Sequence, residues 1–191
     1  MRAYGPQKLT ANLTRKEGMQ GLDFVLGGAR SGKSRMGEAL VTSLPSPWTY
    51  IATAEAFDDE MRARIALHQA ERQPGWRTVE APLALAEAIS HQNTTGQPIL
   101  VDCLTLWLAN VLLADRDLEQ ASAGLLGALA AVSVPIVLVS NEVGLGIVPD
   151  NALARRFRDA QGRLNQQIAA LAARVIFMAA GLPLILKGPP L

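Results

Sequence analysis

A glycine-rich stretch near the start of the chain, GGARSGKS, combines residue types and a spacing that bind phosphate groups. It matches the phosphate-loop pattern G-x-x-x-x-G-K-[ST] through Gly27, Gly32, Lys33 and Ser34. The glycines let the backbone turn so that several N–H groups point at phosphate oxygens. The lysine neutralises the outer phosphates, and the serine hydroxyl can ligate Mg²⁺. An apolar run precedes the motif and a helix-like stretch follows it, which disfavours an accidental match. The motif therefore predicts a nucleoside triphosphate site.

Asp102 is a second candidate, because it is a carboxylate placed directly after the apolar run at residues 99–101. In nucleotide-binding folds, an acidic residue at the end of a buried strand holds Mg²⁺ directly or through water. Asp102 could instead cap the helix that follows it, since Asp is favoured at that position, and the two roles need not exclude each other. The sequence thus offers Ser34 and Asp102 as metal ligands.

The chain has two histidines, and spacing alone gives neither a catalytic role. His68 shares a helical face with Met61 and Ile65, which is more typical of a partly buried helix residue than of a catalytic group. His91 lies in a polar stretch that we expect to be a solvated loop. Glu80 could accept hydrogen bonds from a base or a ribose, or merely end a strand.

Five charged residues in the C-terminal half of the chain could contact an anionic substrate. They are Glu142, Arg155, Arg156, Arg158 and Arg163. Charges on one face of a helix are more often solvated or part of a subunit contact. Both interpretations stay open.

Apolar runs, glycines and prolines predict alternating strands and helices around these residues. Strands are expected at residues 23–26, 48–53, 76–80, 99–102, 135–140, 174–179 and 184–187. Helices are expected at residues 33–43, 58–72, 82–90, 104–113, 118–131 and 149–173. Continuous apolar strands that alternate with helices are typical of an α/β fold with a mostly parallel sheet flanked by helices. Such sheets bind ligands at the carboxyl ends of their strands, where we expect Thr53.

The length of 191 residues suggests one domain, which we place at residues 21–191. Residues 1–20 carry more basic than acidic side chains and follow neither the helix nor the strand period, which predicts a flexible N-terminal tail. They also lack the apolar core of a signal peptide. The longest apolar stretch, residues 123–139, is shorter than the roughly 20 residues of a membrane span. We therefore expect a cytoplasmic protein without a membrane span.

Charge and cysteine content exclude further classes of function. The net charge of +1 argues against a general nucleic-acid binder. The single cysteine, Cys103, excludes a disulfide framework and a cysteine-based zinc site. It lies in an apolar run, where we expect it to fill space in the core.

Four stretches together resemble the bifunctional adenosylcobinamide kinase/adenosylcobinamide-phosphate guanylyltransferase family. They are GGARSGKSRMGEAL, YIATAEAFDDEMRARIALHQAERQPGWRTVE, ILVDCLTLWLANVLL and VLVSNEVGLGIVPDNALARRFRDAQGRLNQQIAALA. The resemblance covers residues 22–187, and its most specific part is NEVGLGIVP followed by RFRD. The phosphate loop alone would not identify the family.

The resemblance implies a RecA-like P-loop fold, a homotrimer and an enzyme of cobalamin biosynthesis. Such an enzyme phosphorylates the aminopropanol hydroxyl of adenosylcobinamide with ATP or GTP, using Mg²⁺. It then transfers GMP from GTP to that phosphate through a GMP–histidine intermediate. The catalytic residues implied are His68 and Lys33, which replaces the structural interpretation of His68. The nucleotide contacts implied are Gly27, Gly28, Ala29, Arg30, Ser31, Gly32, Lys33, Ser34, Ala52, Thr53, Ala54, Gln69, Ala70, Glu71, Arg72, Glu80 and Asp102.

Two positions depart from the family pattern. Leu67 stands where relatives can carry a second histidine, so His68 has no neighbour that could replace it. Asp102 stands where relatives can carry Glu, and the shorter side chain favours contact with a metal through water. Two alternatives stay open: a P-loop small-molecule kinase without nucleotidyl transfer, and a non-catalytic nucleotide switch. The absence of a guanine-reading N-K-x-D motif weighs against the switch.

Overall fold

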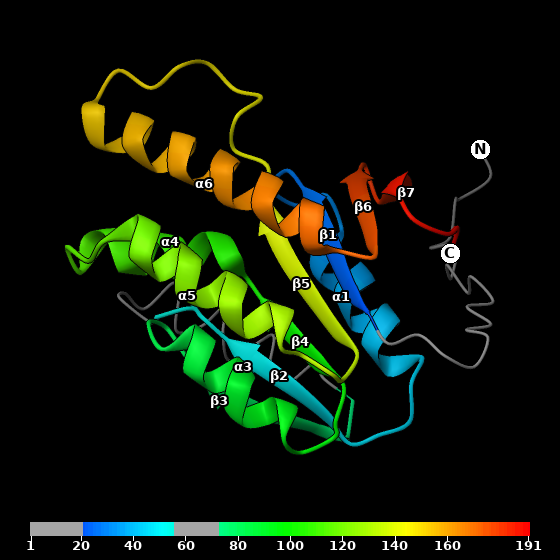
Figure 1. The fold of residues 1–191 in the computed structure, drawn as a ribbon. Helices are drawn as coiled ribbons and strands as arrows, with labels where there is room; N and C mark the ends of the chain where they lie inside the picture. Colours follow the sequence, from blue (N-terminus) through cyan, green and yellow to red (C-terminus); the bar gives the residue numbers. More distant parts are fainter. Residues whose placement is uncertain (1–20, 56–72) are drawn as a thin grey trace, which may run out of the picture.

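The structure of the protein is a computed structural model that describes residues 21–55 and 73–191. Within these ranges, seven strands form one sheet in the order β3-β2-β4-β5-β1-β6-β7 (Figure 1). The strands are β1 Leu22–Gly27, β2 Trp48–Ala52, β3 Trp76–Glu80, β4 Ile99–Asp102, β5 Ile136–Asn141, β6 Arg174–Ala179 and β7 Leu182–Lys187. All neighbouring pairs are parallel except β6 and β7. The predicted α/β fold with a mostly parallel sheet is confirmed.

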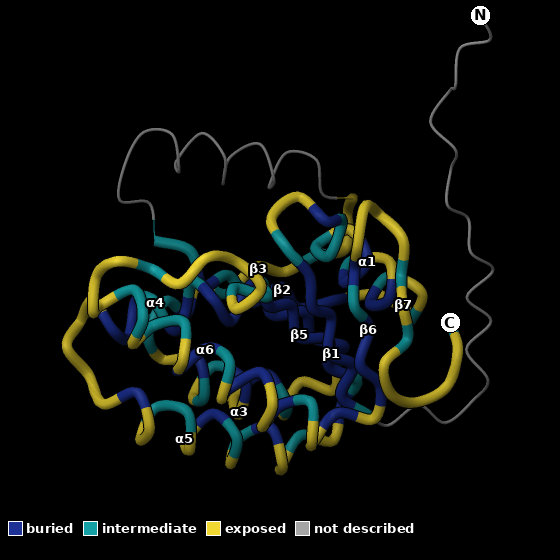
Figure 2. Tube along the Cα trace, turned by 90° about the horizontal axis from the view of Figure 1, so that it is seen from above, coloured by how far each residue is buried: buried dark blue, intermediate teal, exposed yellow. Residues whose placement is uncertain are grey.

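Helices cover both faces of this sheet, which explains why its central strands are apolar throughout. Of the described helices, α1 (Lys33–Thr42) packs on one face with Met36, Leu40 and Val41. On the other face lie α3 (Leu85–Asn93), α4 (Leu104–Leu113), α5 (Leu118–Ala130) and α6 (Ala152–Leu171) (Figure 1). Figure 2 shows the central strands buried and the connecting segments largely exposed.

The packing of α1 on the sheet is close, and this fixes where the helix begins. A Cβ atom added at Gly37 would lie 2.9 Å from Val139 Cγ2 and 3.0 Å from Leu100 Cδ1. Only a glycine lets the helix approach these strands without displacing them. The first turn of α1 is thereby held at the carboxyl edge of β4 and β5.

Two predicted elements differ from the structure in their bounds. Helix α3 starts three residues later than expected and runs to Asn93, so His91 lies in its last turn instead of a loop, although it is exposed as expected. Strand β7 starts at Leu182, because Ala180 and Gly181 alone make the turn, with φ angles of 51° and 81°. Pro183 fits inside β7 since this is an edge strand, which needs no N–H on its open side.

The remaining described elements agree with the prediction to within a few residues. The long helix α6 starts at Ala152, after Asn151, whose side-chain oxygen accepts a hydrogen bond from the Ala154 N–H at 2.7 Å. The predicted helix at residues 58–72 and the predicted tail at residues 1–20 both lie outside the described residues. The domain boundary at residue 20 stays a prediction.

A buried ion pair joins β1 to β6 at the amino edge of the sheet. Arg174 Nη2 lies 2.5 Å from Asp23 Oδ2, the two residues are register partners, and both side chains are almost fully buried. Removing one member of such a pair takes away the opposite charge that balances the other inside the core.

Arg174→Met should therefore lower the free energy of unfolding by about 3–5 kcal/mol. Urea denaturation followed by circular dichroism measures this change. The double variant Asp23→Leu/Arg174→Met should recover most of the loss, because it leaves no buried charge. A double variant as unstable as Arg174→Met would show that the loss comes from packing and not from charge.

Candidate functional site

The predicted phosphate loop connects the end of β1 to the start of α1, and two of its glycines are required by geometry. A Cβ atom at Gly27 would collide with the Ser31 side chain and with the Met178 carbonyl of the neighbouring strand. Gly32 has a φ angle of 94°, which residues with a side chain rarely adopt. The turn of the β6–β7 hairpin braces the loop, since the Gly181 N–H donates to the Ser31 carbonyl at 2.9 Å.

The N-terminus of α1 is left open for an anion. Gly32 is its N-cap, so no side chain caps the helix, and the first turn holds no acidic residue. Lys33 Nζ donates to the Gly28 carbonyl at 3.2 Å, which places the ammonium group over the loop. Free helix N–H groups beside an ammonium group form an anion site of the kind that binds phosphate.

Asp102 ends β4 and is positioned by a tyrosine that no sequence motif marks. Tyr50 Oη donates to Asp102 Oδ2 at 3.2 Å, across the β2–β4 boundary. The N-cap of α4 is Cys103, without a side-chain hydrogen bond, so the alternative reading of Asp102 as a helix cap is wrong. The carboxylate therefore remains available at the carboxyl edge of the sheet.

Thr53 lies at the predicted edge, but its hydroxyl is already engaged. It donates to the Cys103 carbonyl at 2.7 Å and accepts from the Cys103 N–H at 2.9 Å. Asn110 Nδ2 donates to the Thr53 carbonyl at 2.8 Å, so this corner is fixed from two sides. The Thr53 side chain is fully buried. It positions the backbone next to Asp102 and does not offer its hydroxyl to a ligand.

The charge of Lys33 in the loop and that of Asp102 in β4 both act on the Cys103 thiol. Burial first, and the nearby Asp102 carboxylate second, raise the pKa of the Cys103 thiol to about 11, and Lys33 opposes that rise. Lys33 and Asp102 therefore lie within electrostatic reach of the same atom. Because the thiol stays protonated at neutral pH, Cys103 is a core residue and not a nucleophile. The prediction that it is buried is confirmed.

The other predicted nucleotide contacts divide into two groups. Ala52, Glu80 and Asp102 end neighbouring strands and are register partners across β3, β2 and β4, so they form a row at the edge that also carries the loop (Figure 1). Ala54 follows Thr53 at that edge. The second group, Gln69, Ala70, Glu71 and Arg72, lies outside the described residues, as does the predicted catalytic residue His68.

The charged residues considered for an anionic substrate are partly engaged with their own segments. The Glu142 N–H donates to the Gly27 carbonyl at 3.1 Å, and its carboxylate accepts from the Gly144 N–H at 2.6 Å. Arg155 donates to the Pro149 and Asp150 carbonyls, at 2.9 and 2.8 Å. Glu142 is thus the member of this group that lies next to the loop.

The donor set at the edge fits Mg²⁺. No group of three His, Cys, Asp or Glu residues occurs among residues 21–55 and 73–191 that could form an all-protein metal site. Mg²⁺ needs no such group, because it binds through one or two protein oxygens, several waters and the substrate phosphates. The hydroxyl of Ser34 and the carboxylate of Asp102 are hard oxygen ligands of that type.

Tyr50→Phe tests the positioning of this carboxylate. Loss of the hydroxyl removes a hydrogen bond to a charged group, while the phenyl ring keeps the edge-on contact with Trp76 at a centroid distance of 5.9 Å. The Mg²⁺ concentration for half-maximal GTP binding should rise several-fold, which a calorimetric titration at stepwise Mg²⁺ measures. If the Mg²⁺ requirement is unchanged, Tyr50 does not position a metal ligand.

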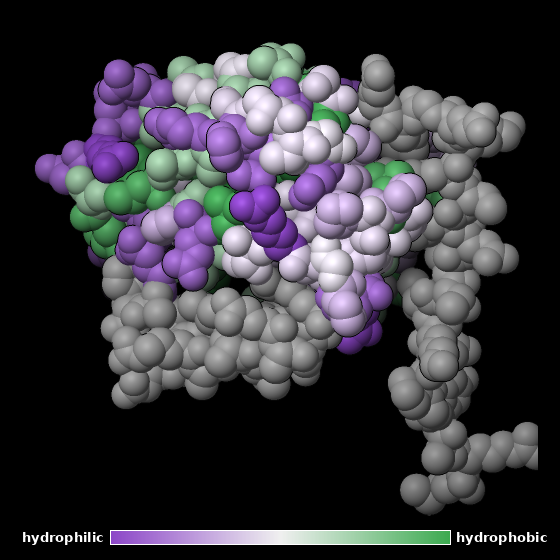
Figure 3. Space-filling view, turned by 90° about the horizontal axis from the view of Figure 1, so that it is seen from below, coloured by the Kyte–Doolittle hydropathy of each residue, from purple (hydrophilic) through white to green (hydrophobic). Residues whose placement is uncertain are grey.

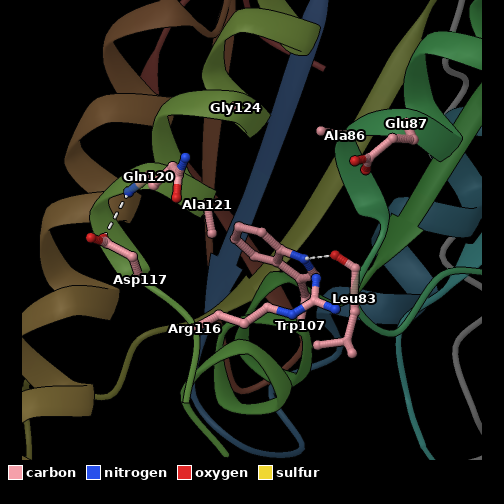
Figure 4. A pocket seen from close by; sticks show the side chains of 9 residues that line it. All are labelled: Leu83, Ala86, Glu87, Trp107, Arg116, Asp117, Gln120, Ala121 and Gly124. Atoms are coloured by element: carbon pink, nitrogen blue, oxygen red, sulfur yellow. Dashed lines mark hydrogen bonds between the residues drawn. The ribbon is translucent and has the colours of Figure 1, made fainter. Parts of the chain in front are cut away.

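A separate cavity of about 450 Å³ lies between the starts of α3 and α5, with Trp107 of α4 against it (Figure 4). The Trp107 indole N–H donates to the Leu83 carbonyl at 3.2 Å, and Arg116, Asp117 and Glu87 contribute its charged lining. None of the residues that the sequence predicts to be catalytic, to bind nucleotide or to bind metal lines this cavity. The cavity is thus distinct from the phosphate loop.

Figure 3 shows the face of the molecule seen from below, where separate hydrophobic patches lie among hydrophilic residues. None of the helices in the described ranges has the length and apolar content to cross a bilayer.

The chain is similar to known proteins over most of its length. The sequence model described as "Cobinamide kinase / cobinamide phosphate guanyltransferase" matches residues 23–186. The chain is 51% identical over 171 residues to the bifunctional adenosylcobalamin biosynthesis protein CobP of Pseudomonas aeruginosa, covering 88% of this chain and 99% of that protein. It is 42% identical over 179 residues to the similarly named CobU of Escherichia coli, covering 86% and 98%.

Among solved structures, the chain is similar to the flagellar accessory protein FlaH of Methanocaldococcus jannaschii. The TM-score is 0.51 at 14% identity, covering 88% of this chain and 79% of FlaH. At this level of identity the likeness supports the fold alone.

Proposed function

This chain belongs to the cobinamide kinase / cobinamide phosphate guanyltransferase family, and on that premise we propose how its residues carry out the two reactions. The protein is a transferase of adenosylcobalamin biosynthesis with nucleotide and cobinamide substrates. In the first reaction, the aminopropanol hydroxyl of adenosylcobinamide takes the terminal phosphoryl group of ATP or GTP. In the second, GMP passes from GTP to the new phosphate and pyrophosphate leaves.

The observation that carries the kinase step is the open N-terminus of α1 with Lys33 over the loop. The substrate hydroxyl oxygen attacks the terminal phosphorus and gives its proton to solvent, the bond between that phosphorus and the bridging oxygen breaks, and the nucleoside diphosphate leaves. The loop N–H groups and Lys33 stabilise the negative charge that collects on the leaving phosphates. Mg²⁺, which Ser34 and Asp102 would hold, would neutralise phosphate oxygens when bound.

For the guanylyl step we propose His68 as the nucleophile, on the strength of the family resemblance of RIALHQAER. A neutral imidazole is available at neutral pH, since the ordinary pKa of histidine is about 6.5. Its nitrogen attacks the α-phosphorus of GTP, and pyrophosphate leaves. An oxygen of the cobinamide phosphate then displaces the imidazole from the phosphorus and forms adenosylcobinamide-GDP.

Incubation of the protein with GTP and Mg²⁺, followed by intact mass measurement, tests this proposal. The expected result is a mass increase of one guanylyl group, which is GMP less water, lost again on addition of cobinamide phosphate. Phosphorylation of cobinamide without a covalent adduct would favour the small-molecule kinase. Failure to turn over any triphosphate in the presence of cobinamide would favour the nucleotide switch.

The resemblance also supports two proposals about the protein in the cell, a homotrimeric assembly and a cytoplasmic location. Light scattering of the purified protein tests the first proposal, with three times the mass of the chain as the expected result. A monomeric mass would contradict it. Cell fractionation tests the location.

A further inference from the structure

Asn141 is the last residue of β5, and its side chain lies on the α1 face of the sheet at the carboxyl edge. It is the register partner of Gly27, the first glycine of the loop. Val139, two residues earlier, packs in the core cluster of the α1 face. Because side chains alternate along a strand, Asn141 faces the same way as Val139, one step closer to the edge where α1 begins.

The side-chain amide of Asn141 is incompletely satisfied. Its Oδ1 atom is buried and has no hydrogen-bond partner among the described residues. A buried amide atom without a partner is costly, and such exceptions call for an explanation. The Nδ2 end of the amide has no hydrogen-bond partner among the described residues and is not among the buried atoms, so it is the donor that a ligand can reach.

The backbone of Asn141 is held firmly from the opposite face. Its N–H donates to Thr105 Oγ1 at 2.8 Å, and its carbonyl accepts from Asn165 Nδ2 at 3.2 Å. Asn165 Oδ1 in turn accepts from Ser140 Oγ and from Gln161 Nε2, both at 2.9 Å. This buried network fixes the backbone while the side chain on the α1 face has no partner for Oδ1, an arrangement suited to a preorganised ligand contact.

The position of β5 indicates which part of the ligand the amide would meet. β5 lies between β1, which ends in the loop, and β4, which ends in Asp102. Neighbouring strands are about 4.8 Å apart, so phosphates held by the loop on one side and through Asp102 on the other lie over the end of β5. We propose that the Asn141 amide donates a hydrogen bond to the terminal phosphate of the bound triphosphate and so distinguishes triphosphates from diphosphates.

This inference rests on the proposed nucleotide site and adds a specificity-determining residue to it. The test compares the α,β-methylene analogues of GTP and GDP, which differ only in the terminal phosphate and cannot expel a leaving group at the α-phosphorus. Calorimetry in the presence of Mg²⁺ gives the ratio of their dissociation constants. Asn141→Ala should reduce the preference for the triphosphate analogue about ten- to a hundredfold, the range for a hydrogen bond to a charged group.

Asn141→Asp sharpens the test, because it keeps the size of the side chain and its acceptor oxygens but replaces the donor by a charge that repels phosphate. It should lose more of the preference than Asn141→Ala. The control is Asn93→Ala, which removes amide contacts to the Ser133 and Val134 N–H groups near the opposite end of β5. This control should keep the wild-type ratio.

An unchanged ratio in both Asn141 variants, with the wild-type protein binding both analogues, would overturn the role of Asn141 and leave the nucleotide site standing. An equal loss of affinity for the two analogues would also overturn it, since that result indicates a structural role. If the wild-type protein bound neither analogue, the nucleotide site itself would fail and the inference with it.

Discussion

Lys33→Ala should abolish both activities, with each rate falling at least about a hundred- to a thousandfold. The ammonium group lies over the loop through its hydrogen bond to the Gly28 carbonyl, at the edge that also carries Asp102. In the kinase step it stabilises the departing diphosphate, and in the guanylyl step the departing pyrophosphate. One cation therefore serves two leaving groups. Rates of cobinamide phosphorylation and the yield of the GMP adduct measure the two losses separately.

The matched control for this variant is Arg35→Ala. Arg35 is an exposed cation two residues further along α1, so the change in net charge is the same. This variant should keep both activities. Retention of either activity in Lys33→Ala would show that the two reactions do not share one phosphate site.

His68→Ala should eliminate the covalent GMP adduct while sparing much of the kinase reaction. The reason is that a nucleophile at the α-phosphorus takes no part in transfer of the terminal phosphoryl group. Intact mass after exposure to GTP measures the adduct, and a phosphorylation assay with ATP measures the kinase. The control is His91→Ala, which changes the only other histidine of the chain. A GMP group still bound to His68→Ala would exclude His68 as the nucleophile.

The sequence was sufficient to predict the loop and its position, because the requirements there are local. Gly32 needs a positive φ angle, and α1 begins with the next residue, so the motif itself specifies the turn. Glu80 and Asp102 could also be placed at strand ends, since apolar runs mark where parallel strands end, whereas Ala52 came from the family resemblance alone. These features depend on neighbours in the chain or on the general geometry of a parallel sheet.

The contacts that position the site could not be predicted, because they join residues about fifty positions apart. The bond from Tyr50 to Asp102 and the bonds from Thr53 to Cys103 depend on the register of β2 and β4. No spacing in a single sequence encodes that register. The place of Asn141 beside the loop could not be predicted for the same reason, since only the alignment of β5 with β1 sets it next to Gly27.

The ion pair between Asp23 and Arg174 has a consequence at the far end of the same strands. A slip of β1 against β6 by one residue would separate two opposite charges inside an apolar interior, so the alternative alignments of these strands are heavily penalised. The same alignment sets Gly27 beside Met178 and lets the hairpin turn at Gly181 reach Ser31. An ion pair at the amino edge of β1 and β6 thus helps to set the position of the phosphate loop at the carboxyl edge of the same strands.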